Sequence, residues 1–184
     1  MGSGWKYELR VCGPGDEERL ALVGGASFLE AFAGFLEGED ILAHCRKQHS
    51  VEKYAAMLAE EETRVCVAEV KGSAVGYAVI CPPDIPVPTT ADDMELKRIY
   101  LLHRFQGSGI GAALMEWSAE TARSLGKGRL LLGVNDENDK AVAFYLRNGF
   151  EHAGTRRFQV GNMLCSDFIL AKKLDGLTGT AGAD

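Results

Sequence analysis

The sequence predicts a mixed α/β (α+β) domain in which helices flank a central sheet. Residues 5–11 alternate apolar and charged side chains, which is typical of a half-buried strand. Residues 65–80 have the pattern of a hairpin, and residues 94–149 hold two successive units in which a strand precedes a helix. Strands and helices that follow one another in this way are typical of a sheet covered by helices.

The composition agrees with a single globular domain. The chain has 184 residues, of which 46% are hydrophobic and 25% charged. We expect one domain over residues 1–174. Residues 175–184 are small and polar, so we expect a disordered tail there.

The N-terminal half is expected to be largely helical after its first strand. Helical patterns cover residues 16–23, 26–36 and 51–61. Gly24-Gly25 and Gly38 are predicted to interrupt them, and Ser50 is a candidate N-cap for the third helix. Strands at residues 65–70 and 75–80 would then form a hairpin, which a proline-rich loop ends.

The strand predicted at residues 94–101 is irregular. Met94 and Leu96 lie on one face, whereas strict alternation would place Ile99 and Leu101 on the other. A β-bulge near Lys97-Arg98 accounts for this slip, and it would splay the strand from its neighbour and open a slot into the sheet. An ordinary strand buried on both faces is an equally weighted alternative.

A glycine-rich loop, Gln106-Gly107-Ser108-Gly109-Ile110-Gly111, connects this strand to a helix predicted at residues 112–125. Glycines let the chain turn sharply and present consecutive N–H groups to an anion, and a helix N-terminus adds unpaired donors. The loop therefore predicts a pyrophosphate site. It lacks the Gly-Lys-Ser/Thr ending of a P-loop, and too little chain follows it for a doubly wound dinucleotide-binding sheet. A turn that only packs the helix on the sheet is the alternative.

A second motif follows an apolar strand at residues 129–134. Asn138 is a candidate N-cap and Gly149 a candidate C-terminal stop of a short helix, with Phe144 and Tyr145 near its end. Taken alone, these two aromatic residues are more typical of a core than of a catalytic site. Closing strands are expected at residues 150–153, 156–160 and 168–171.

Together these motifs resemble the GNAT superfamily of N-acetyltransferases in order and spacing, over about residues 5 to 174. The matching segments are Glu95…Ile99-Tyr100-Leu101, Gln106-Gly-Ser-Gly-Ile-Gly111 and Asn138-x-x-Ala141-x-x-Phe144-Tyr145-x-x-x-Gly149-Phe150. The resemblance implies the GNAT fold, a mixed central sheet of about seven strands with a splayed, bulged strand, flanked by about four to five helices. Residues 95–100, 132–134 and 154–170 look most like bacterial enzymes that acetylate polyamines and related small amines, although residues 135–136 and 161–165 depart from that branch.

The resemblance implies an acetyl-CoA-dependent enzyme that transfers an acetyl group to a primary amine. By the match, the coenzyme contacts are Tyr100, Leu101, Leu102, Gln106, Gly107, Ser108, Gly109, Ile110, Gly111, Asn138 and Phe144. Acetyl transfer requires that the ammonium lose a proton, that the oxyanion be hydrogen-bonded and that the leaving thiolate be protonated. Glu95 is the candidate base, acting directly or through water. The alternative, that Glu95 is only a surface residue or is salt-bridged to Lys97, is equally well supported. Tyr145 is the candidate acid, and a backbone N–H near Tyr100 or Leu101 would polarise the thioester carbonyl.

The charge balance bears on the partners. The chain has 20 basic and 26 acidic residues, a net charge of −6, which argues against nucleic-acid binding and mildly favours a cationic acceptor such as a polyamine. Phe28, Phe32 and Phe35 stand among acidic residues and would suit such an amine, but an amphipathic packing helix explains them at least as well. A protein or peptide amine is the alternative acceptor, and a non-catalytic acyl-CoA-binding sensor is the alternative function.

Cysteine and histidine spacing predicts no disulfide framework and no metal site. The five cysteines are scattered without C-x-x-C spacing, and the four histidines lack the spacing of metal ligands. No segment has the length of a membrane span, and the N-terminus has no apolar signal core. We therefore expect a cytoplasmic protein without membrane partners, and a homodimer is one assembly state that the sequence leaves open.

Overall fold

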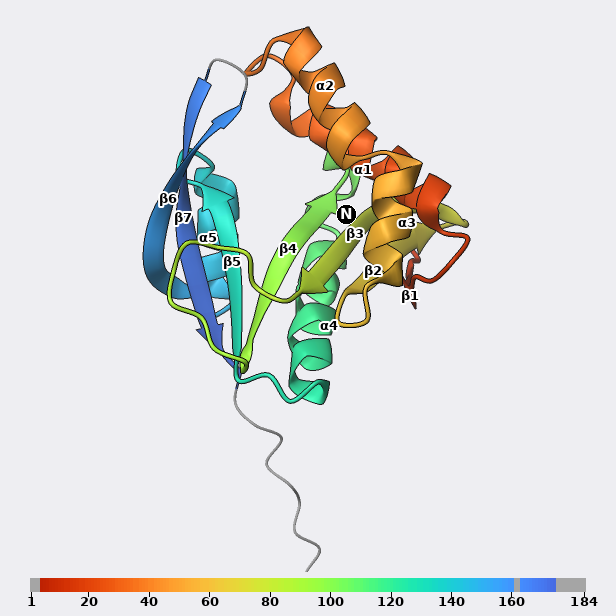
Figure 1. Cartoon of the computed structure of the whole chain (residues 1–184). Helices are drawn as coiled ribbons and strands as arrows, with labels where there is room; N and C mark the ends of the chain where they lie inside the picture. Colours follow the sequence, from red (N-terminus) through yellow and green to blue (C-terminus); the bar gives the residue numbers. More distant parts are fainter. Residues whose placement is uncertain (1–3, 161–162, 175–184) are drawn as a thin grey trace, which may run out of the picture.

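A seven-stranded mixed sheet organises the computed structural model, which describes residues 4–160 and 163–174. Its strand order is β1-β2-β3-β4-β5-β7-β6, and β4 and β5 are parallel. Figure 1 shows α1, α2 and α3 on one face of this sheet and α4 and α5 on the other. The expected fold class is confirmed. In chain order the elements are β1 (Glu8–Val11), α1 (Glu17–Phe32), α2 (Gly38–Gln48), α3 (Val51–Ala59), β2 (Arg64–Val70), β3 (Ser73–Cys81), β4 (Asp93–Leu101), the 3-10 helix η1 (His103–Phe105), α4 (Ile110–Ser124), β5 (Arg129–Asn135), α5 (Asp139–Arg147), β6 (Glu151–Val160) and β7 (Met163–Lys173).

Each face of the sheet has its own apolar core. The larger core lies against α4 and α5 and includes Met94, Leu114, Leu132 and Tyr145. The smaller core lies under α1 and α3 and includes Leu20, Tyr54, Val65, Tyr77 and Val79. Because strand residues alternate between faces, β2, β3 and β4 contribute to both cores.

The predicted bulge in β4 is present. Val79 pairs with Arg98 while the next residue of β3, Ile80, pairs with Leu96, so Lys97 is one extra residue on β4. Met94, Leu96, Ile99 and Leu101 all contact the core under α4 as a result. The phase slip in the sequence therefore marked a bulge, and not an ordinary strand without one.

The hairpin of β2 and β3 is also confirmed. The two strands pair from Arg64 with Ile80 to Val70 with Ser73. Lys71 and Gly72 form the two-residue turn, with φ of 52° and 76°. Positive φ at both positions matches the twist of the flanking strands.

The predictions for the N-terminal helices are partly wrong. Gly24-Gly25 does not break the helix, because α1 runs through both residues as one helix, Glu17–Phe32. The helix α2 over Gly38–Gln48 was not predicted, and Ile41 is its one fully buried residue. The third helix begins as expected, since the Ser50 hydroxyl accepts a hydrogen bond from the Lys53 N–H.

The closing strands are longer and fewer than expected. The segments predicted at residues 150–153 and 156–160 are one strand, β6, which a register shift between His152 and Gly154 bends without interrupting. The first strand, β1, begins at Glu8 rather than at residue 5. The tail expected at residues 175–184 lies outside the described residues.

Candidate active site

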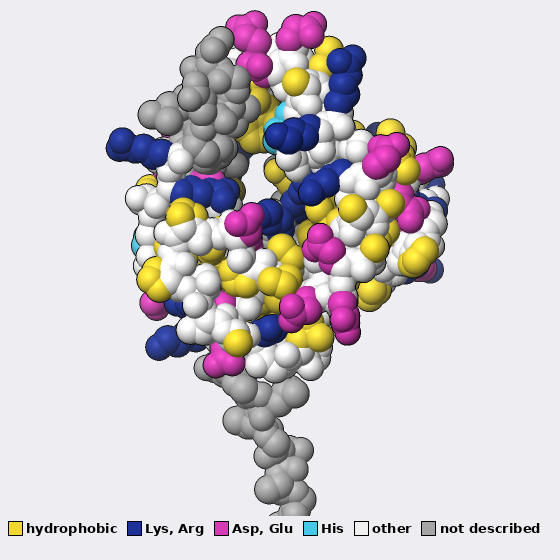
Figure 2. Space-filling model, in the orientation of Figure 1, with side chains coloured by type: hydrophobic (Ala, Val, Ile, Leu, Met, Phe, Trp, Pro, Cys, Tyr) yellow, Lys and Arg dark blue, Asp and Glu magenta, His cyan; other side chains and the backbone are white. Residues whose placement is uncertain are grey.

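The sheet opens between β4 and β5. These strands pair only from Asp93 to Glu95, opposite Arg129 to Leu131. Beyond the bulge, β4 stays paired with β3 and β5 with β7, so the two halves of the sheet diverge (Figure 1). Figure 2 shows the resulting opening at the centre of the molecule, with basic side chains along part of its margin.

The backbone of β4 directs free donors into this opening. The Leu102 N–H donates to the Val75 carbonyl at 2.9 Å, and Tyr100 pairs with Tyr77 two residues earlier. In an antiparallel pair, the residue between two hydrogen-bonded positions points its N–H away from the partner strand. The Leu101 N–H therefore faces the opening. Of the two residues considered as donors to the thioester carbonyl, Leu101 fits and Tyr100 does not, because the Tyr100 N–H is directed at β3.

The glycine-rich loop lies where β4 leads into α4. Gly107 and Gly109 have φ of 75° and 89°, which glycine adopts without strain, and Gly109 is the N-cap of α4. The Gln106 and Ser108 N–H groups donate to the carbonyls of His103 and Phe105.

The other amides of this loop are open to a ligand. In the described part of the chain, the Gly107 and Gly109 N–H groups have no hydrogen-bond acceptor. Those of Ile110 and Gly111 belong to the first turn of α4, which has no intrahelical acceptors. A Cβ built on Gly107 or Gly109 meets nothing within 4 Å, so space is open beside these amides. This donor set fits the diphosphate of coenzyme A.

Asn138 and Phe144 lie at the two ends of α5. The Asn138 side-chain oxygen accepts a hydrogen bond from the Ala141 N–H at 3.1 Å, which confirms the predicted cap. The exposed side-chain amide of Asn138 keeps its N–H donors free for a ligand. Phe144 is half-buried, and its ring meets that of Tyr145 edge to face at 5.5 Å.

Tyr145 lies in the core formed by α4 and α5. Its ring contacts Phe150 at 5.8 Å, and its side chain is 8% exposed. Burial, together with the neighbouring Tyr100, raises the pKa of the Tyr145 phenol well above its ordinary value. The phenol therefore stays protonated and uncharged at neutral pH, so it can hydrogen-bond a leaving thiolate and act as its proton donor.

Glu95 lies on the opposite face of the sheet, where β4 and β5 begin to part. It is 2% exposed, and its Oε2 accepts a hydrogen bond from the Asp84 N–H at 2.8 Å. Its Oε1 lies 3.5 Å from the Lys97 Nζ, so the ion pair considered from the sequence is also present. The bulge places both partners of this pair beside the opening.

Sequence reasoning missed a polar network next to Glu95. Arg98 was considered only as a bulge residue and as part of the matching segment 95–100, yet it shares the face of Glu95 and donates a hydrogen bond to the Tyr54 hydroxyl at 3.0 Å. The Tyr54 hydroxyl also contacts the Tyr77 hydroxyl at 2.9 Å and the His49 Nδ1 at 3.0 Å. Alternation corrected for the bulge would have placed Glu95, Arg98 and Tyr100 on one face, but it could not have found their partners.

A separate surface hollow of about 630 Å³ lies at the other end of β4. Residues 60–64, Met94 and Lys127 are among those that line it, and it contains none of the predicted site residues. Among the described residues, no group of His, Cys, Asp or Glu could hold a metal ion. None of the described helices has the length and apolarity of a membrane span.

Comparisons with known proteins agree with this geometry. The family model for the acetyltransferase (GNAT) family matches residues 28–150. An uncharacterized N-acetyltransferase of Mycobacterium tuberculosis is 32% identical over 159 residues, which cover 86% of this chain and 98% of the relative.

Two solved structures share the fold. The PaiA N-acetyltransferase from Thermoplasma acidophilum, in complex with coenzyme A, has a TM-score of 0.76 at 24% identity and covers 91% of this chain and 99% of its own. The ribosomal-protein-S18-alanine N-acetyltransferase from Escherichia coli has a TM-score of 0.65 at 19% identity and covers 97% of this chain and 100% of its own. The chain therefore belongs to the acetyltransferase (GNAT) family and is an N-acetyltransferase with acetyl-CoA as its co-substrate.

Proposed function

We propose that this protein acetylates the primary amine of a small molecule, with Glu95 as the base and Tyr145 as the acid. The observation that carries the proposal is the opening between β4 and β5. The loop with free amides and Tyr145 lie toward α4 and α5, whereas Glu95 lies on the face of α1 and α3. Acetyl-CoA and the amine substrate can therefore approach the opening from opposite faces of the sheet.

Each step can be given to a residue of this chain. Amides between Gly107 and Gly111 bind the diphosphate, and Asn138 donates to the pantetheine arm beside Phe144. Acetyl-CoA supplies the acyl group and the leaving thiolate. The Leu101 N–H hydrogen-bonds the carbonyl oxygen as negative charge develops on it. Much of the acceleration comes from holding amine and thioester in contact.

Proton transfer is divided between the two faces. Glu95 removes a proton from the ammonium, and its burial favours transfer through one bound water. The hydrogen bond from Asp84 and the Lys97 ammonium hold this carboxylate in place. Tyr145 delivers a proton to the thiolate from the other face.

The class of acceptor is argued from charge. A net charge of −6 supports the small cationic amine, such as a polyamine, that the sequence favours. The Arg98 guanidinium on the acceptor face opposes an acceptor with several positive charges. A protein amine is a second candidate, because the Escherichia coli structure with this fold belongs to an enzyme named for a ribosomal-protein alanine.

Thiol release measured across a panel of amines tests the proposal. The panel contains alkylamines, putrescine, spermidine, amino acids and a peptide with an N-terminal alanine. We expect Tyr145→Phe and Glu95→Gln to lower kcat by about a hundredfold or more, with little change in the KM for acetyl-CoA. Tyr7→Phe is the matched control, because Tyr7 leads into the edge strand β1, which β2 and β3 separate from β4.

The outcomes separate the candidate functions. Turnover of small amines that falls in both variants supports the proposal. Turnover of the peptide alone favours a protein substrate. Tight coenzyme binding without turnover of any amine would favour the acyl-CoA sensor, for which Glu95 and Tyr145 are dispensable.

A further inference from the structure

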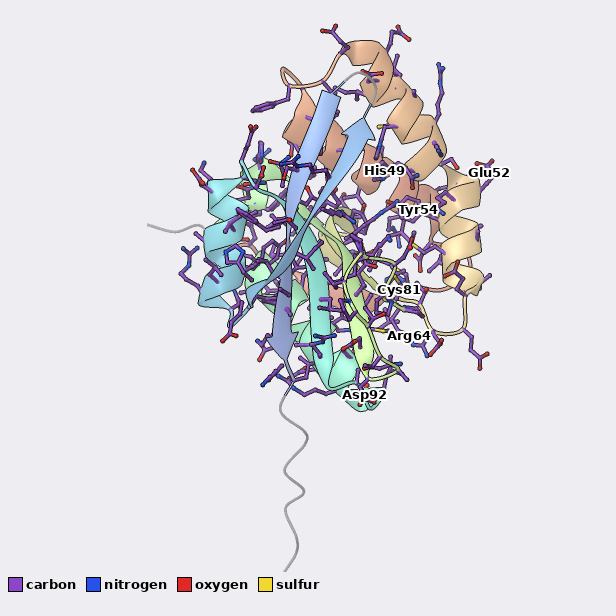
Figure 3. The ribbon with its side chains drawn as sticks, turned by 60° about the vertical axis from the view of Figure 1, so that its left-hand side comes forward. His49, Glu52, Tyr54, Arg64, Cys81 and Asp92 are labelled. Carbon is purple, nitrogen blue, oxygen red and sulfur yellow. The ribbon has the colours of Figure 1, made fainter. Side chains whose placement is uncertain are left out.

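Among the described residues, Arg98 donates hydrogen bonds to neutral groups only. It follows the bulge in β4 and is half-buried on the face that carries Glu95. Its Nη1 donates to the Gln48 carbonyl and to the Tyr54 hydroxyl, both at 3.0 Å, and its Nη2 donates to the Gln48 side-chain oxygen at 3.2 Å. Figure 3 shows Tyr54, on α3, and His49, which follows α2, on the side of the molecule where these helices lie, and their side chains are 3.0 Å apart.

In the part of the chain that the structure describes, two donors of the Arg98 guanidinium have no acceptor. A guanidinium has five N–H donors, and the contacts above use three of them. Nε and the second Nη2 hydrogen remain without an acceptor in residues 4–160 and 163–174. Because no side-chain nitrogen there is both buried and unbonded, the Arg98 Nε must be accessible to solvent.

The free edge is the one that binds carboxylates elsewhere in this chain. Arg129 holds both oxygens of Asp93 with Nε and Nη2, each at 2.7 Å. Arg156 holds one oxygen of Asp167 with the same two nitrogens, at 2.9 and 2.7 Å. This fork matches the geometry of a carboxylate and makes a charge-assisted pair of hydrogen bonds.

The positive charge of Arg98 is not neutralised within the described protein. No described carboxylate lies within ion-pair distance of it, and the nearby Glu95 is engaged by Lys97. Two histidines that feel this charge are neutral at pH 7: burial, then the charge of Arg98, lowers the pKa of His49 to about 3, and the same two causes, followed by Lys47, lower that of His44. A partly buried cation among neutral groups is costly, and an anion from outside would relieve that cost.

We infer that the acceptor carries a carboxylate in addition to its primary amine, and that the free Nε–Nη2 edge of Arg98 binds this carboxylate. The inference rests on the proposed function, because it places the amine at Glu95 on the same face of β4. It narrows the substrate to amino acids and related amino carboxylates, and it makes Arg98 a specificity-determining residue. Polyamines, which offer only further positive charge, would be poor acceptors.

Matched pairs of amines test the inference. Glycine, β-alanine and γ-aminobutyrate are each compared with the alkylamine that has a methyl in place of the carboxylate, namely ethylamine, propylamine and butylamine. We expect kcat/KM to favour the amino acid by about tenfold or more in at least one pair, because a charge-assisted bidentate contact has that magnitude. Putrescine should be poorer than γ-aminobutyrate.

Variants of Arg98 identify the group responsible. Arg98→Gln should reduce the preference within the pair to near unity, and Arg98→Lys should retain only part of it, since lysine lacks the fork. The ratio of kcat/KM for two substrates does not depend on how much of the enzyme is folded. This matters because Arg98 also connects Gln48 to Tyr54, so its replacement can lower stability. Arg46→Gln, on the exposed side of α2 near Gln48, is the matched control and should leave the ratio unchanged.

Several results would overturn the inference. One is a wild-type preference for the alkylamine in every pair, and another is a preference that survives Arg98→Gln. If the variant instead changed the choice between succinyl-CoA and acetyl-CoA, the carboxylate would belong to the acyl group and not to the acceptor. Failure of every amine to release thiol would contradict the proposed function itself. In that case calorimetry with butyrate and the coenzyme A complex decides: binding that Arg98→Gln abolishes supports the carboxylate site, and absence of binding refutes it.

Discussion

Gly24 and Gly25 are neighbours in α1, yet they have different surroundings. A Cβ on Gly24 would lie 2.2 Å from the Tyr54 hydroxyl and 2.5 Å from the His49 Nδ1, whereas a Cβ on Gly25 would meet nothing within 4 Å. The Tyr54 hydroxyl is held by His49, Tyr77 and Arg98, so it cannot move aside. Gly24 is therefore required for close packing, and Gly25 is not.

Alanine substitutions at these two glycines should have opposite effects. We expect Gly24→Ala to lower the free energy of unfolding by roughly 2 kcal/mol, because overpacking exceeds the gain in helix propensity. Gly25→Ala is the matched control and should raise it by about 0.5–1 kcal/mol. Thermal melts of both variants measure the difference. Equal stabilisation by the two alanines would show that the contact between α1 and Tyr54 is not tight.

His49 makes the stability of the protein depend on pH. Its folded-state pKa lies at about 3, below its ordinary value of 6.5, because burial and Arg98 disfavour the imidazolium. Below pH 6.5 the unfolded chain therefore binds a proton that the folded chain does not bind. The contribution of His49 to stability is complete above pH 6.5 and decreases as the pH falls toward 3, by up to about 1.4 kcal/mol per pH unit.

Replacing this histidine should flatten that dependence. His49→Asn removes the titrating ring, and its amide can still bond the Tyr54 hydroxyl. We expect the free energy of unfolding, measured by urea titration, to fall less steeply between pH 6.5 and 4.5 than in the wild type. His103→Asn, at an exposed position in η1, should keep the wild-type slope. An unchanged slope in His49→Asn would mean that other groups control the acid sensitivity.

At the scale of elements, the bulge in β4 is the feature that opens the sheet. Without Lys97 the strand would read Met94-Glu95-Leu96-Arg98-Ile99-Tyr100-Leu101, which alternates without error and keeps every remaining side chain on its present face. Deletion of Lys97 therefore offers a way to remove the bulge while the apolar residues of β4 stay in the core.

The deletion should separate folding from activity. We expect the variant to fold, with its melting temperature within a few degrees of the wild type, and to lose thiol release with every amine because a regular β4 would pair further along β5. Lys97→Arg keeps both the bulge and the positive charge beside Glu95, so it should retain most of the activity. Full activity after the deletion would show that the divergence of β4 from β5 does not depend on the extra residue.

Local patterns predicted the elements whose cause is local. The slip between Leu96 and Ile99 indicated the bulge, and Asn138 and Gly149 indicated both ends of α5. The errors arose where the cause is distant. Gly24 suggested a break because its contact, Tyr54, is 30 residues further along the chain, and the role of Arg98 depends on Gln48, which precedes it by 50 residues. Such contacts leave no local signal in a single sequence.

For the whole molecule, the short pairing between β4 and β5, which connects the two halves of the sheet, has a consequence for ligand binding. Only three residue pairs join β4 to β5. A coenzyme held by the loop at the start of α4 and by Asn138 on α5 would contact both halves. Binding should then stabilise the whole domain, since a ligand that binds only the folded state shifts its unfolding.

We expect coenzyme A at about a hundredfold excess over its dissociation constant to stabilise the protein by about 2.7 kcal/mol, or roughly 5–10 °C in melting temperature. Gly109→Ala strains the left-handed N-cap of the loop and should reduce this increment. Gly126 has a similar φ, 75°, and lies beyond the other end of α4. Gly126→Ala is therefore a matched control for the strain and should keep the full increment.

Hydrogen exchange gives the independent readout, because the amides of Gly107 and Gly109 should be protected only in the complex. An equal increment in both variants, with no protection of the loop, would place the coenzyme elsewhere.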